Sequence, residues 1–165
     1  MSNMSSAYEA SPKSLAGLGA ALRNLHRALV AHARRDYEQQ RGAVLGAGEL
    51  LQLLTSDAHF AWLRSLSELI VDVDVFLEAD PAPTDDETSA VRGEVERLIA
   101  PPKPAAPQSD FASRYWASVH ADPQVAIAHG EVRQALDRLP RPADVDEAQV
   151  LHERHRWTEM RRQRR

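Results

Sequence analysis

The chain has no cysteine among its 165 residues. This absence excludes a disulfide framework, thiolate metal ligands and a cysteine nucleophile. It is compatible with a reducing compartment, and we therefore expect a cytoplasmic protein. A chain of this length can bury a core large enough to fold without disulfides or structural metals.

Long apolar runs are also missing. The most apolar segment, 66–77, is interrupted by Glu68, Asp72 and Asp74, and no stretch approaches the roughly 20 apolar residues that a membrane span requires. Segment 1–11 is polar and lacks the basic start and apolar centre of a secretory signal. We expect a soluble protein with a flexible N-terminus at 1–11 and no membrane partner.

Strand patterns are scarce, because helix-forming residues dominate and apolar residues recur at spacings of three and four. Start signals are Ser11-Pro12, Thr84 with Glu87, and Asp122-Pro123. They predict an all-α fold, a single helical bundle over 12–140 with a proline-rich crossover at 101–108 and a basic C-terminal helix or tail at 141–165. The expected main helices are 12–41, 58–79, 84–100, 110–121, 123–139 and one from 144 to the end, with a short helix at 49–54.

Four aromatic residues are candidate interaction residues. The expected helix 58–79 is apolar on more than one face, and an uncovered face would bind a partner. Trp62 and Phe76 lie on it, and Tyr115 and Trp116 form a second candidate pair, because aromatic side chains dominate interface energies. The alternative is that all four are core residues.

Histidines and carboxylates suggest an alternative function in metal binding. His32 and Asp36 share one helix face, Glu68 and Asp72 share another, and His26 lies beside the first pair. Side chains of these types, facing inward from neighbouring helices, build transition-metal sites for Fe, Mn or Zn. The pattern resembles hemerythrins and ferritins in outline only, because the Glu-x-x-His spacing of ferritins is absent. The other interpretation is a polar cluster, in which Arg23, Arg27 or Arg34 pairs with the two carboxylates of the expected helix 58–79.

The charge is distributed unevenly along the chain. Segment 57–96 holds eleven acidic and two basic residues, and segment 152–165 holds six arginines and two glutamates. The two segments could match one another within the molecule. Alternatively, the tail could bind nucleic acid or an acidic protein surface through its last four arginines, Arg161, Arg162, Arg164 and Arg165.

Patterns of catalysis are absent from the sequence. It has no Gly-x-Ser-x-Gly elbow and no phosphate-binding loop. Segments 49–54 and 60–64, continued by 69–71, look like a group of uncharacterised small all-helical bacterial proteins, and segments 111–115 and 122–129 add to the likeness. The resemblance implies a widespread helical fold and brings no activity with it. We expect a non-enzymatic interaction or regulatory protein that has no cofactor and binds a second copy of itself or another protein.

Overall fold

The computed structural model describes residues 4–80, 82–104, 107 and 109–141, with side chains from Lys13 onward. Within these ranges the chain forms helices only, so the predicted all-α fold is confirmed. None of the described helices has both the length and the apolar character needed to cross a membrane. The elements are α1 (Met4–Arg41), α2 (Ala47–Ser56), the short 3-10 helix η1 (Ala61–Leu63), α3 (Arg64–Leu77), α4 (Asp85–Leu98), α5 (Asp110–Ala121) and α6 (Pro123–Leu136).

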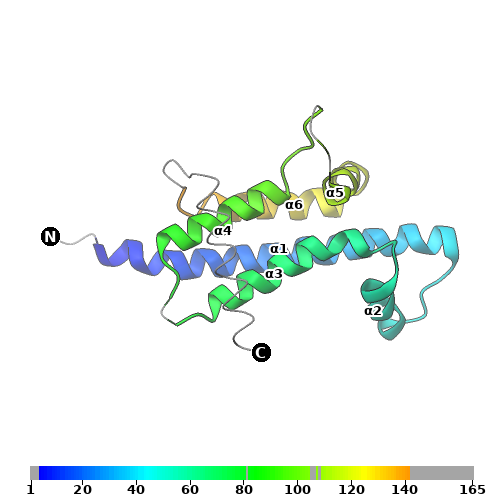
Figure 1. Ribbon diagram of the computed structural model, residues 1–165, viewed down its shortest axis with the longest axis horizontal. Helices are drawn as coiled ribbons and strands as arrows, with labels where there is room; N and C mark the ends of the chain where they lie inside the picture. The colour runs from blue at the N-terminus through cyan, green and yellow to red at the C-terminus, as the bar shows by residue number, and fades with distance from the viewer. Residues whose placement is uncertain (1–3, 81, 105–106, 108, 142–165) are drawn as a thin grey trace.

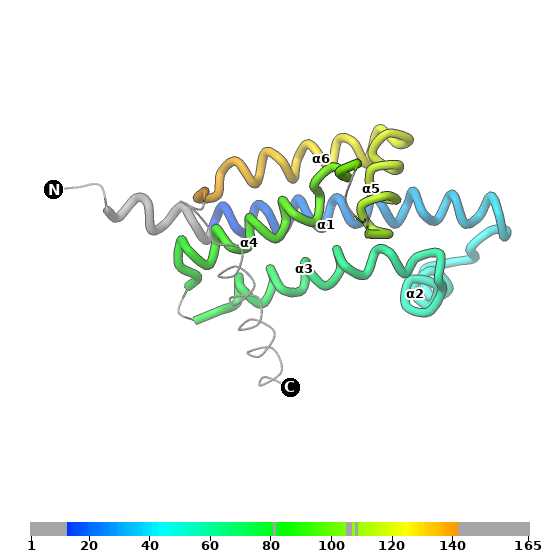
Figure 2. The backbone as a smooth tube through the Cα atoms, turned by 45° about the horizontal axis from the view of Figure 1, so that its top comes forward, coloured from blue at the N-terminus to red at the C-terminus, as the bar shows by residue number. Residues whose placement is uncertain are grey.

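The long helix α1 forms the centre of the structure, with α3 and α6 packed along it (Figures 1 and 2). Its apolar residues follow a spacing of three and four, which places them on one stripe. The five leucines of this stripe are at most 1% exposed: Leu15, Leu18, Leu22, Leu25 and Leu29. The core continues without a break into α3, α4, α5 and α6. The proline-rich segment therefore joins helices that share one core.

Two predicted helix starts are wrong. α1 begins at Met4 and not at 12, so the proline of the Ser11-Pro12 pair lies inside the helix. The expected helix 58–79 is a turn followed by η1 and then α3, which begins at Arg64. In a 3-10 helix, residues three apart lie on the same side. This winding directs both Phe60 and Leu63 inward, at 1% and 2% exposure.

The predicted starts of the later helices are confirmed. Thr84 and Glu87 form a capping box at the start of α4. The side chain of Ser109 accepts a hydrogen bond from a backbone N–H in the first turn of α5. Asp122 caps α6, with Pro123 as its first residue. The expected helix from 144, and the tail arginines, lie outside the described residues.

Candidate functional site

The residues of the metal alternative are dispersed. His26 contacts Ser67, with 2.9 Å between Nε2 and Oγ, and burial lowers the pKa of this histidine. Glu68 is exposed and Asp72 is half-buried. Among the described residues, no three histidine or acidic side chains lie together in a way that could hold a metal ion.

The two remaining members of that set, His32 and Asp36, face different partners. His32 Nδ1 donates to Asp122 Oδ2 at 3.3 Å, whereas Asp36 lies 3.7 Å from His59 Nε2. The arginines expected to neutralise Glu68 and Asp72 also have other partners. Arg23, for example, pairs with Asp74 at 2.6 Å. The geometry therefore favours separate polar contacts between helices over one shared centre.

Asp122 is the centre of a polar cluster that the sequence pattern did not reveal beyond its helix cap. Its side chain is 7% exposed and accepts hydrogen bonds from His32, from Arg35 and from the backbone N–H of Gln124. Burial alone would raise the pKa of Asp122, but the Gln124 hydrogen bond and the charge of Arg35 outweigh it and hold the pKa below its usual value. This carboxylate joins α1 to the junction of α5 and α6.

The four candidate aromatic residues lie mainly in the core. Trp62, Phe76 and Tyr115 are at most 7% exposed, and Trp116 is half-buried, with its indole N–H donating to the carbonyl of Ala100 at 3.0 Å. Three of the four are therefore not available on the surface of a single chain. The core alternative that the sequence left open describes their environment better.

Tyr115 has a specific partner in the core. Its hydroxyl lies 2.6 Å from Nδ1 of His129. Burial raises the pKa of Tyr115 and lowers the pKa of His129. Both groups are therefore neutral near pH 7, so the phenol donates and the imidazole accepts. No local sequence pattern predicts this pair, because the two residues belong to different helices.

Among the described residues, the large apolar side chains with the highest exposure lie on α2 and the loop before it. α2 is the most apolar of the described helices, yet it has no buried residue. Leu45 is 89% exposed and Leu51 is 64% exposed. Leu50, Leu53 and Leu54 rest partly on the core. Gly48, Gln52 and Thr55 are exposed on the same outer side as Leu51. We call the outer set the α2 surface: Leu45, Gly48, Leu51, Gln52 and Thr55.

The α2 surface is held in place by the loop that carries it. Glu38 accepts the backbone N–H of Val44 at 3.0 Å, and Arg34 donates to the carbonyl of the same residue at 2.9 Å. The Val44 side chain is 4% exposed. Gly42, at φ 100°, allows the chain to leave α1 in a conformation that other residues rarely adopt. As Figure 1 shows, α2 then stands beside the C-terminal end of α1.

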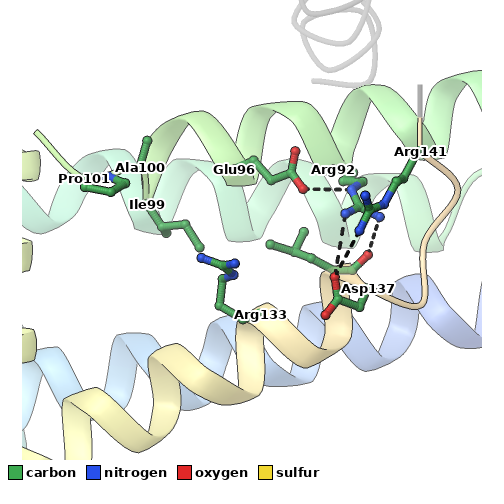
Figure 3. Close-up of a pocket in the computed structure, with 9 residues that line it drawn as sticks. Arg92, Glu96, Ile99, Ala100, Pro101, Arg133, Asp137 and Arg141 are labelled. Carbon is green, nitrogen blue, oxygen red and sulfur yellow. Dashed lines mark hydrogen bonds and ion pairs between the residues drawn. The ribbon is translucent and has the colours of Figure 1, made fainter. Parts of the chain in front are cut away.

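A hollow of about 430 Å³ lies between α4 and α6. Figure 3 shows the buried guanidinium of Arg92 at one end of it. Arg92 donates to the carbonyls of Leu136 and Leu139 at 2.7 and 2.8 Å, and to Glu96 at 2.8 Å. The carboxylate of Asp137 lies 3.9 Å away. Arg92 thus satisfies backbone carbonyls at the C-terminal end of α6, which would otherwise lack partners.

Arg133 and Arg141 also line this hollow, which we call the α4–α6 hollow. Arg141 is 3.8 Å from Asp137 and its side chain is 78% exposed. The side chain of Arg133 has no hydrogen bond or ion pair to any residue that the structure describes. No sequence pattern selects these arginines, since their common location depends on the packing of α4 against α6.

The arginines selected from the sequence, Arg161, Arg162, Arg164 and Arg165, lie outside the described residues. No protein-family model, curated protein or solved structure matches the chain. The suggested likeness to small helical bacterial proteins therefore stays an expectation.

Proposed function

We propose that this chain is a non-enzymatic interaction protein that pairs with a second copy of itself through the α2 surface. The observation that carries the proposal is an apolar helix with no buried residue, held on a fixed loop, with Leu45 and Leu51 largely exposed. Large apolar side chains that are exposed on a well-held element are a feature of protein interaction sites.

A second copy is the favoured partner because this surface carries no charge. Its five residues are uncharged, and the only charged residue of α2 is Glu49. The carboxylate of Glu49 accepts the backbone N–H of Leu45 at 2.7 Å. Two identical uncharged surfaces can meet across a two-fold axis without repulsion. A strongly charged partner would find no complementary charge here.

The expected affinity is modest. Two exposed leucines from each copy would contribute about 6–12 kcal/mol of gross apolar burial, and association itself costs several kcal/mol. We therefore expect a dissociation constant of about 1–100 µM. Pairing in this range depends on protein concentration, which makes it measurable by sedimentation.

Sedimentation velocity over a concentration series tests the proposal. We expect the wild-type chain to pass from monomer to dimer, and the Leu51→Lys variant to stay monomeric, because each copy would bring a charge into the apolar contact. Ile127→Lys is the matched control, since Ile127 is 57% exposed on α6. It should dimerise like the wild type. A wild-type chain that is monomeric throughout, or a dimer that Leu51→Lys leaves intact, would refute the proposal.

A further inference from the structure

The α4–α6 hollow contains more positive than negative charge. Of the described residues that line it, three are arginines, Arg92, Arg133 and Arg141, and two are acidic, Glu96 and Asp137. Arg92 is 4% exposed, and its donors are used by Glu96 and by two backbone carbonyls. Its charge is fixed in the wall of the hollow, but it has little capacity to bind anything further.

The other two arginines have fewer contacts to the described residues. Within that part of the chain, Arg141 makes one long contact, at 3.8 Å to Asp137, and Asp137 is shared with Arg92 at 3.9 Å. Arg133 projects from α6 toward Ile99 at the other end of the hollow (Figure 3). Its positive charge also contributes, after burial, to the lowered pKa of His129. Among the described residues, no carboxylate forms an ion pair with the Arg133 side chain.

We propose that the α4–α6 hollow binds a small organic anion, whose carboxylate or phosphate group is held by Arg133, while Arg141 adds positive charge nearer the other end of the hollow. A guanidinium offers a planar pair of N–H donors that matches the oxygen pairs of both groups. The volume of about 430 Å³ lies within the range of small-molecule sites, roughly 300–1,000 Å³. Ile99, Pro101 and Leu136 provide apolar walls for the carbon part of the ligand.

The negative net charge of the chain allows anion binding at this site to be distinguished from non-specific electrostatic binding of anions. The formal net charge is −4 at pH 7, so the molecule as a whole repels anions. Saturable anion binding would therefore have to come from a local group of arginines. This inference is independent of pairing through α2, because the two surfaces share no residue.

Trp116 offers a reporter of occupancy. Its indole N–H donates to the carbonyl of Ala100, and Ala100 lines the hollow. We would titrate ¹⁵N-labelled protein with inorganic phosphate, and separately with malonate, up to about 50 mM each, with chloride keeping the ionic strength constant. The indole signal of Trp116, assigned with the Trp116→Phe variant, should shift and saturate with at least one probe. The two titrations distinguish a phosphate site from a carboxylate site.

Two variants separate the site from its surroundings. Arg133→Gln should weaken binding about tenfold or more, because a charge-assisted donor pair is lost. Arg138→Gln is the matched control: Arg138 is exposed just after α6 and does not line the hollow, so its removal should change the dissociation constant less than about twofold. Unfolding curves check that both variants fold. Shifts that do not saturate with either probe, or equal weakening by both variants, would overturn the proposal.

Discussion

Replacing Arg92 with methionine should destabilise the protein strongly. The Arg92 side chain is 5% exposed and donates to the carbonyls of Leu136 and Leu139. Methionine keeps most of the apolar stem but leaves both carbonyls without their donor. Hydrogen bonds to a charged group contribute about 1.5–3 kcal/mol each, and removal of the buried charge offsets part of that loss. We expect the free energy of unfolding to fall by about 3 kcal/mol.

Urea denaturation followed by circular dichroism measures this change, and the midpoint of thermal unfolding should fall by about 10 °C. Arg92→Lys should give an intermediate loss, since one ammonium group cannot reproduce the fork that reaches both carbonyls and Glu96. Arg97→Met is the control: Arg97 is 47% exposed and its ion-pair partner among the described residues is Glu94 on its own helix, so a loss below about 1 kcal/mol is expected. If Arg92→Met also lost less than about 1 kcal/mol of unfolding free energy, the reasoning would be refuted. Such a result would mean that water molecules donate to the carbonyls of Leu136 and Leu139 in place of Arg92.

Two further predictions concern the polar contacts between helices. Asp122→Ala removes the cap of α6 and the partner of two α1 side chains. It should therefore lower the free energy of unfolding, measured by urea denaturation, by about 2 kcal/mol. Asp110→Ala is the control and should have a clearly smaller effect, because the Asp110 side chain is 69% exposed. Acid should destabilise the fold through His26 and His129, because burial lowers the pKa of both below 6.5. The unfolded chain then binds more protons, so stability should be constant above about pH 6.5 and fall as the pH decreases toward the folded-state pKa values. Denaturation curves between pH 8 and 5 check this, and the decrease should be smaller in His129→Gln; an equal decrease would contradict the role of that histidine.

Much of the fold was predictable from local sequence signals. Thr84 with Glu87, and Asp122 with Pro123, mark helix starts because the capping atoms and the capped N–H groups lie within a few residues of one another. The leucine stripe of α1 follows from spacing alone. The winding of η1 was not predictable in the same way, since it depends on how Phe60 packs against α1.

The functional surfaces were much less predictable. The sequence pointed to Trp62 and Phe76 as contact residues, but large aromatic side chains are equally suited to a core, and both are buried. The exposure of Leu51 depends on the absence of a covering helix among the described elements, which no local pattern encodes. Arg92 has backbone carbonyls as its main partners, and these have no signature in residue type.

Disulfide formation between single engineered cysteines tests the central claim, pairing through the α2 surface, most directly. The chain has no native cysteine, so Gln52→Cys on α2 and Ala126→Cys, exposed on α6, each introduce one thiol. Under mild oxidation at equal concentration, we predict that Gln52→Cys forms covalent dimers about tenfold faster than Ala126→Cys, because pairing raises the local thiol concentration. Adding Leu51→Lys should remove that advantage. Equal rates for the two cysteine variants would contradict the account.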